Sequence, residues 1–247
     1  MSSTLNGGAP ALTPPERNNF FYGMMLDVEA CQKDQRHADF KRSLLNRLLL
    51  GRGVACGLRL AASHDDPARV RLEPGVAIDG WGREIVVSEA VTFDPHRLTN
   101  DQGEPTGDPL STGTVSVLLG YDETQADPRP SLAPSCASGE ACAPATVREG
   151  YRILVRPAAA DPPPAATPPP LSWPWSQPDA LHAMLSEHIE ARSLAAPPHP
   201  AVLLGRVTVD DGTIDGATRR QIVYGHAVLW EVIAALAAEV AALKARP

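Results

Sequence analysis

Apolar side chains recur with a helical period in the first part of the chain. Between residues 27 and 50 they return every three or four positions, and charged side chains occupy the opposite face. Asp27 can cap this helix, because its carboxylate accepts hydrogen bonds from the free amides of the first turn. Gly51 and Gly53 can end it, since glycine tolerates the left-handed backbone that closes many helices. The pattern predicts an amphipathic helix of about 24 residues. Its apolar face is richest toward the end, at Leu44, Leu45, Leu48 and Leu49.

A β pattern follows this helix. Short apolar or alternating runs are separated by Gly, Pro and Asp, as strands are separated by turns. Asp79-Gly80 lies between the runs 76–78 and 83–87, and Asp-Gly is favoured in the tight turn of a hairpin. Residues 115–121 are almost all apolar, which is typical of a strand in the middle of a sheet. We therefore expect a mainly β protein with some α-helix, in which residues 54–156 form a β-sandwich-like domain.

The pattern changes again after this domain. Residues 157–178 contain nine prolines. Proline cannot donate to a β-ladder and favours extended backbone, so this stretch is interpreted as a semi-rigid linker. Residues 179–225 then predict a short helix and a second small β-segment.

The last segment, residues 226–247, is alanine-rich and predicts a coiled-coil-like helix. Its larger apolar residues step by four, three, four and three positions, which is a heptad spacing with β-branched residues at one core position and leucine at the other. Two alternatives are open: the seam joins copies of the chain, or it packs on the chain's own β-domain. The seam consists of Leu229, Ile233, Leu236, Val240 and Leu243.

The chain begins with a polar arm and an aromatic cluster. Residues 1–17 are rich in Ser, Gly, Pro and Thr and are interpreted as a flexible arm. Phe20, Phe21 and Tyr22 follow directly, so residues 18–53 combine an aromatic cluster with the long helix. The cluster is either a plug on its own domain or an anchor in a neighbouring subunit, because buried aromatic side chains often dominate interfaces.

Charge and hydropathy exclude several classes of protein. The formal net charge is −7, which argues against a nucleic-acid-binding surface. No stretch reaches the roughly 18 consecutive apolar residues of a membrane span. The first residues lack the pattern of a secretory signal. We therefore expect assembly in the cytoplasm, and release as part of an extracellular particle stays open.

The cysteines and carboxylates are the candidate ligand-binding groups. Cys31 and Cys56 are expected to be buried as small apolar residues. Cys136 and Cys142 lie in a Pro/Ser/Gly-rich loop, where free thiols, a disulfide and a metal site are all open. Glu123 and Glu149 could add oxygen ligands, together with Asp127. These groups define an alternative function, a metal- or carbohydrate-binding accessory module.

The sequence carries no recognisable catalytic set. None of the HExxH, GxSxG, P-loop and GxGxxG motifs is present, and the histidines are scattered. The sequence therefore predicts a protein that is not an enzyme and that needs no cofactor.

Several spaced motifs resemble one family of bacterial proteins. The chain resembles the baseplate- and tail-fibre-associated family of contractile phage-tail-like particles, which includes extracellular contractile injection systems and related phages. The resemblance covers about residues 18–156. The matching motifs are Phe21-Tyr22-Gly23-Met24-Met25-Leu26-Asp27, Asn46-Arg47-Leu48-Leu49-Leu50-Gly51-Arg52-Gly53-Val54-Ala55-Cys56-Gly57-Leu58, the run 74–85, Tyr121-Asp122-Glu123, the loop 136–142 and Arg148-Glu149-Gly150-Tyr151.

The resemblance implies a structural adaptor that attaches to a baseplate or to tail fibres. In this interpretation the aromatic cluster and the leucines at the end of the first helix contact baseplate or fibre proteins. The C-terminal seam would join copies of the chain into a homo-oligomer, with three copies expected.

Overall fold

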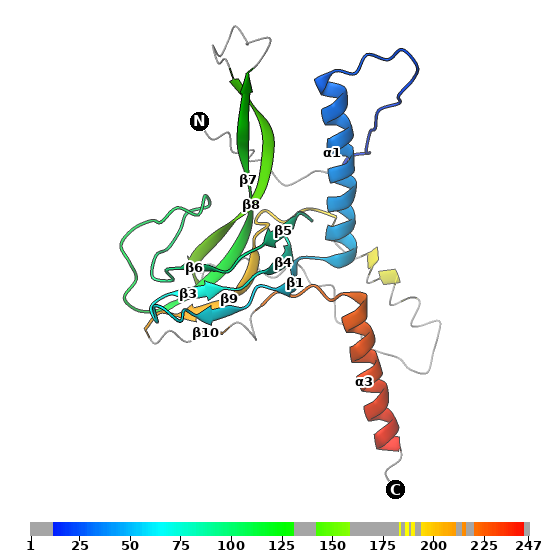
Figure 1. Ribbon diagram of the computed structural model, residues 1–247. Helices are drawn as coiled ribbons and strands as arrows, with labels where there is room; N and C mark the ends of the chain where they lie inside the picture. Colours follow the sequence, from blue (N-terminus) through cyan, green and yellow to red (C-terminus); the bar gives the residue numbers. More distant parts are fainter. Residues whose placement is uncertain are drawn as a thin grey trace.

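The computed structural model describes residues 12–130, 142–158, 183, 186–187, 189–190, 194–210, 214–215 and 220–244. Within them the protein consists mainly of strands in small sheets, with two long helices (Figure 1). The expected class, mainly β with α, is confirmed. The elements are α1 (Val28–Leu45), the π-helical turn η1 (Asn46–Leu50), β1 (Gly53–Gly57), β2 (Leu60–Ala62), β3 (Val70–Leu72), β4 (Gly75–Ile78), β5 (Glu84–Val87), β6 (Val91–Phe93), β7 (Thr114–Pro130), β8 (Cys142–Pro157), β9 (Val202–Thr208), β10 (Ile214–Asp215) and α3 (His226–Lys244).

Three antiparallel sheets form the body of the protein. Their strand orders are β1-β4-β5, β2-β3-β6 and β10-β9-β7-β8. The hairpin predicted around Asp79-Gly80 is confirmed, because β4 pairs with β5 from Gly75↔Val87 to Ile78↔Glu84. The central position predicted for residues 115–121 is also confirmed, since β7 lies between β8 and β9.

Strand β9 belongs to the main sheet. The sequence placed this run in a second β-segment beyond the proline-rich stretch, whereas in the structure Val202–Thr208 pairs directly with β7. The physical reason is burial: most side chains of β9 are buried on both faces, and a strand of that kind needs neighbours on both sides. Most of the predicted linker and short helix lies outside the described residues.

The sheets share one apolar core. Its fully buried side chains come from strands and turns far apart in the sequence. The sheets are therefore packed together, and the β-sandwich-like arrangement stays a prediction. The largest of its fully buried apolar side chains are Leu58, Leu72, Ile85, Leu119 and Leu204.

The hairpin of β7 and β8 extends beyond the body. The two strands pair from Val115↔Pro157 to Pro130↔Cys142. Side chains of β7 are buried as far as Tyr121 and are mostly exposed beyond it. Figure 1 shows this outer part (green) projecting beside α1 (blue).

Helix α1 begins and ends as the sequence predicts. Asp27 caps it, accepting a hydrogen bond from the amide of Ala30 at 2.7 Å. The π-helical turn η1 continues it to Leu50, and Gly51 follows with φ of +81°. Near the start of α1, Lys33 pairs with Glu16 of the preceding segment at 3.0 Å.

Both helices extend away from the sheets, in opposite directions in Figure 1. Ala30 is the one buried residue of α1. The burial predicted for Cys31 and Cys56 is therefore wrong: both cysteines are exposed. For Cys31 the reason is that no strand of the described residues covers the first turns of the helix. No helix in the described part of the chain is long and apolar enough to cross a membrane.

Candidate interaction surfaces and the joint that holds them

The end of α1 is fixed to the β4–β5 hairpin by polar side chains. Asn46 donates through its side-chain amide to the carbonyl oxygen of Gly82 at 2.9 Å and to the carboxylate of Glu84 at 2.7 Å. Arg42 lies 3.3 Å from the same carboxylate. We call Arg42, Asn46, Gly82 and Glu84 the α1 joint. Two of the matching motifs, residues 46–58 and 74–85, thus meet here. Their contact sets the direction of α1.

Close backbone approaches require glycine in the α1 joint and at the start of β1. Gly82 has φ of +89°, and a Cβ atom there would lie 1.9 Å from the carbonyl oxygen of Ser43 in α1. Gly53 has φ of +153°, and its Cβ would lie 2.7 Å from the backbone of Ile222. Both positions combine a backbone conformation that disfavours side chains with a lack of space. These two glycines, which belong to the matching motifs, therefore allow segments of backbone to pack closely.

A buried carboxylate organises the turn between β4 and β5. Asp79 is fully buried. Its side chain accepts hydrogen bonds from the amides of Trp81 at 2.8 Å and Arg83 at 2.9 Å, and it forms an ion pair with the Arg83 guanidinium at 2.6 Å. A buried charge of this kind is tolerated because it is paired and hydrogen-bonded. Asp79 has the structural role expected of Asp in a turn.

The Arg83 guanidinium also contacts two aromatic rings. It lies 4.6 Å from the centre of the Trp81 ring and 4.4 Å from that of Tyr121, within the range of cation–π attraction. Tyr121 donates its hydroxyl hydrogen to Glu123 at 2.7 Å. Burial, reinforced by that hydrogen bond, raises the pKa of the Tyr121 hydroxyl above its ordinary value. A hydroxyl held in its neutral form suits a packing role.

The same turn holds the segment that leads into β9. The Trp81 ring nitrogen donates to the carbonyl oxygen of Pro197 at 2.8 Å, and the amide of Gly80 donates to that of Pro200 at 2.8 Å. Arg52 donates to the carbonyl oxygen of His199 at 3.1 Å. Burial lowers the pKa of Arg52, and nearby Asp79 opposes this shift. These contacts were not predicted from the sequence, because they join residues more than 100 positions apart and no local pattern indicates them.

Helix α3 leaves the body next to the end of α1. The amide of Val54 donates to the carbonyl oxygen of Gln221 at 2.8 Å, and the amide of Val223 donates to that of Val54 at 2.9 Å. The side-chain oxygen of Gln221 accepts from the amide of Leu203 at 3.0 Å. Strand β1 therefore follows the end of α1 in the chain and is bonded to the segment that leads into α3.

The aromatic cluster forms an exposed loop ahead of α1. We call residues 20–26 the aromatic loop. Its one backbone turn is closed by the amide of Met24 donating to Phe21 at 3.0 Å. Tyr22 is fully exposed, and Phe20, Phe21 and Met25 are each more than half exposed. The described part of its own domain does not bury the cluster, and its role as an anchor stays a prediction.

The leucines at the end of α1 divide between two environments. Leu44 and Leu48 are half-buried toward the body, whereas Leu45 and Leu49 are 54% and 72% exposed. Only the second pair is available to another protein. The sequence grouped all four because a helical period does not reveal which part of a broad face the chain itself covers.

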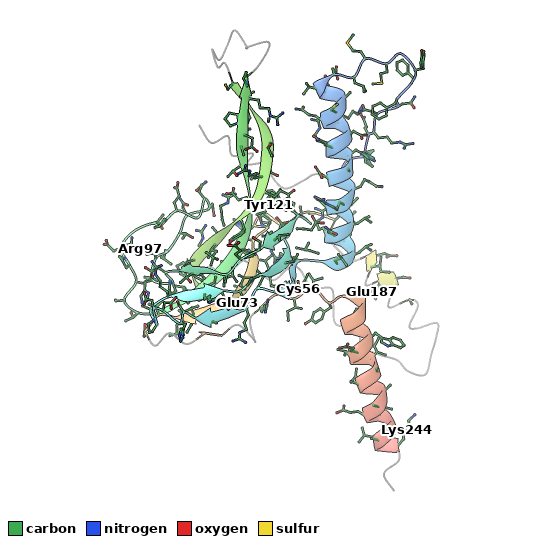
Figure 2. All side chains as sticks on the ribbon, viewed as in Figure 1. Cys56, Glu73, Arg97, Tyr121, Glu187 and Lys244 are labelled. Carbon is green, nitrogen blue, oxygen red and sulfur yellow. The ribbon has the colours of Figure 1, made fainter. Side chains whose placement is uncertain are left out.

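The α3 seam is exposed along its whole length. The five side chains of the seam, Leu229 to Leu243, are between 45% and 62% exposed, and neighbouring Trp230 is 71% exposed. Figure 2 shows the side chains of α3, as far as Lys244, standing clear of the strands. Among the residues that the structure describes, none of the β-domain covers the seam.

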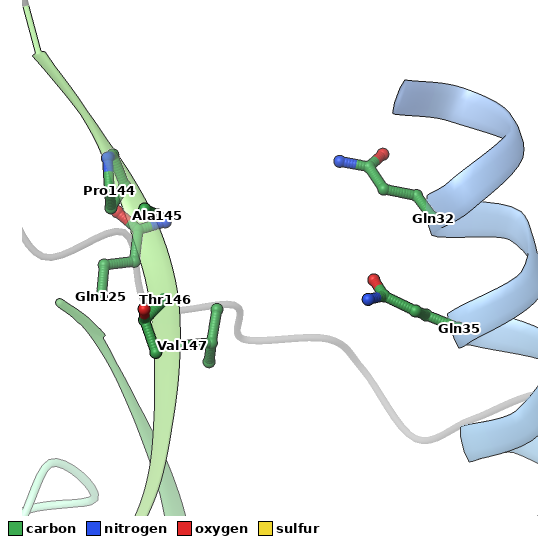
Figure 3. A pocket seen from close by; sticks show the side chains of 7 residues that line it. All are labelled: Gln32, Gln35, Gln125, Pro144, Ala145, Thr146 and Val147. Atoms are coloured by element: carbon green, nitrogen blue, oxygen red, sulfur yellow. The ribbon is translucent and has the colours of Figure 1, made fainter. Parts of the chain in front are cut away.

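A polar hollow lies between α1 and the β7–β8 hairpin (Figure 3). Its volume is about 500 Å³, and Gln32 and Gln35 face Gln125 and Thr146 across it. Amide groups can bind hydroxyls or backbone, but no aromatic or charged side chain of the described residues lines this space. It therefore lacks the usual features of a carbohydrate or metal site.

Of the predicted metal ligands, Glu123 and Glu149 lie opposite each other in the β7–β8 pairing. No group of three or more His, Cys, Asp or Glu side chains is placed in the described residues to hold an ion. Asp127 pairs with Arg148 at 2.9 Å, and Glu123 accepts from Tyr121. Cys142 is exposed, while Cys136 lies outside the described residues. The free thiol, disulfide and metal alternatives for this pair stay predictions.

Comparison with known proteins adds no relative. A scan against protein-family models gave no match to this chain, and a search of curated proteins gave none either. The functional argument therefore depends on the geometry of the surfaces described above and on the motif resemblance.

Proposed function

We propose that this protein is a structural adaptor subunit of a contractile phage-tail-like particle, where it attaches to baseplate or tail-fibre proteins. One observation carries the proposal: large apolar side chains are exposed on segments that are attached to the folded sheets. The aromatic loop precedes α1, Leu45 and Leu49 lie at the other end of α1 and in η1, and the seam lies on α3. Aromatic and apolar residues at fixed positions are typical of protein–protein interfaces.

The energetics favour a stable assembly over a transient contact. Each fully buried Leu, Ile, Val or Phe side chain contributes about 1.5–3 kcal/mol relative to an exposed one. Covering the five side chains of the α3 seam therefore offsets a large part of the cost of association, which is about 4–15 kcal/mol. The aromatic loop adds a second such surface at the far end of α1.

In this proposal each of the two surfaces binds a different partner. The aromatic loop with Leu45 and Leu49 faces the baseplate or fibre proteins, and α3 faces another copy of the chain. Function in this proposal depends on binding and not on catalysis. Assembly takes place in the cytoplasm, and the protein leaves the cell only as a part of a released particle.

Cosedimentation with intact particles tests the proposal. Particles are purified by ultracentrifugation from cells that express the tagged chain, and the fraction of chain in the particle peak is measured. A triple variant, Phe20→Ser with Phe21→Ser and Tyr22→Ser, is expected to lose most of this association. The matched control is Val147→Ser, which removes an apolar side chain that is 56% exposed on β8 and outside both surfaces.

Two outcomes contradict the adaptor function. One is a native chain that stays in the soluble fraction while particles sediment. The other is a triple variant that cosediments as well as Val147→Ser, which would remove the aromatic loop from the interface.

A further inference from the structure

We infer that α3 pairs with α3 of a second copy as a parallel, two-stranded coiled coil, in which Glu239 of each chain faces Lys244 of the other. This inference deepens the proposed function, because it names the partner of one of the two surfaces. It changes the expected number of copies from three to two.

The seam assigns the heptad positions of α3. Steps of four, three, four and three place Ile233 and Val240 at position a, and Leu229, Leu236 and Leu243 at position d. In parallel coiled coils, β-branched residues at a with leucine at d favour two strands, whereas leucine at a with isoleucine at d favours more. The seam therefore fits a dimer.

The charged residues of α3 determine the orientation of the pair. In this assignment Glu239 lies at position g and Lys244 at position e of the next heptad, and both are exposed. In a parallel pair, g of one helix faces the following e of the other, so Glu239 meets Lys244 twice across the two-fold axis. In an antiparallel pair g faces g and e faces e, and this attraction is absent.

The described part of the body does not cover the seam. Leu229 and Val240, the least exposed of its members, are still 45% and 48% exposed. Figure 1 shows α3 (orange to red) directed away from the sheets and opposite to α1. A parallel pair along α3 would therefore leave both α1 helices pointing away from the coiled coil, toward the same side. The dimer would present two aromatic loops to one partner, and bivalent attachment strengthens binding without any new contact.

A charge-swap experiment on the purified full chain tests the inference. The dimer dissociation constant is measured by sedimentation equilibrium for the native chain, Glu239→Lys, Lys244→Glu and the double variant. Each single variant turns two attractive pairs into repulsive ones and is expected to raise Kd by about tenfold. The double variant restores both pairs and is expected to return within about threefold of the native Kd.

Glu231→Lys is the matched control. It makes the same change of charge on the same helix at position f, which faces solvent in a coiled coil. Its Kd is expected to stay within about twofold of the native value. At about 1 M salt, where exposed charges are screened, the differences between the variants are expected to shrink. Circular dichroism checks that the β-signal of the body is the same in all of them.

The possible results separate this inference from the proposed function. A native dimer with charge rescue supports the inference. A monomer, a trimer, or a dimer without rescue by the double variant overturns it. Each of those results leaves the cosedimentation experiment intact, because the aromatic loop precedes α1 and is separate from α3. Conversely, a chain that dimerises but does not join particles contradicts only the adaptor function.

Discussion

Helices α1 and α3 both stand clear of the sheets, yet they differ in composition. α1 carries seven Asp, Glu, Lys and Arg side chains in 18 residues, whereas α3 carries three in 19. A helix with charged residues around much of its surface is stable in water, while one that is apolar on most faces is normally buried. Exposure of a helix therefore does not by itself identify a binding surface. Exposure of a helix that is mostly apolar indicates one.

The two helices also differ in how they are attached. Arg42 and Asn46 at the end of α1 contact side chain and backbone of the β4–β5 hairpin. α3 follows a backbone connection to β1 through Gln221 and Val223. The joint directs α1, so its loop is presented at a fixed position. The described residues show no such joint at α3, and in our proposal a second copy supplies its packing.

The largest expected effect comes from polar substitution in the α3 seam. A double variant, Ile233→Asp with Val240→Asp, places charges at two a positions and is expected to raise the dimer Kd at least about 100-fold. The body should keep its thermal transition, because these side chains lie outside the core. The control, Ala234→Asp with Ala238→Asp, puts the same residues on the outer face of α3. If the two double variants dissociate equally in analytical ultracentrifugation, the seam is not the dimer interface.

The next effect concerns the backbone of the α1 joint. Gly82→Ala places a Cβ atom 1.9 Å from the Ser43 carbonyl oxygen at a positive φ, and is expected to lower the free energy of unfolding by about 3 kcal/mol. Gly107→Ala is the control: φ is +67° but no heavy atom lies within 4 Å, so about 1 kcal/mol is expected. Urea unfolding measures both, and equal losses would mean that Gly82 serves only the turn.

A smaller effect is expected at the polar part of the joint. Asn46→Ala removes two hydrogen bonds and should cost about 1–2 kcal/mol. Amide hydrogen exchange should rise in the last turns of α1 and not in the sheets. Gln35→Ala, at an exposed position of the same helix, is expected to change stability by less than about 0.5 kcal/mol. Unchanged exchange in α1 after Asn46→Ala would show that other contacts hold the helix.

The smallest effect is a pH dependence from Tyr121. Burial raises its pKa in the folded protein above the ordinary value of 10.0, so only the unfolded chain ionises just above that pH. Stability is unaffected below about pH 10 and should fall by up to about 1 kcal/mol between about pH 10 and pH 11. Tyr121→Phe should flatten this slope, whereas Tyr22→Phe, at a fully exposed tyrosine, should not. An identical slope in both variants would exclude Tyr121 as its source.

Local features of the fold were predictable from the sequence. The Asp27 cap, the helix end at Gly51 and the hairpin around Asp79 each depend on residues within a few positions of one another. Such signals are carried by backbone chemistry that neighbours in the chain determine. The continuous apolar run of β7 likewise indicated a central strand.

Features that depend on distant parts of the chain were not predictable. The pairing of β9 with β7 joins residues about 90 positions apart, across the proline-rich stretch. The stacking of Arg83 on Tyr121 and the donation from Trp81 to Pro197 have the same character. A helical period shows that Cys31 lies on an apolar stripe, but it does not show whether anything covers that stripe. The division of the leucines at the end of α1 has the same cause.

The mass of the full chain in solution tests the central claim most directly, namely that α3 is an uncovered helix that needs a second copy. Sedimentation equilibrium over a wide range of protein concentration should give the mass of two chains, falling to one chain for the variant with Ile233→Asp and Val240→Asp. A native chain that sediments as a single, stable monomer at every concentration, with α3 still fully helical, would contradict the account.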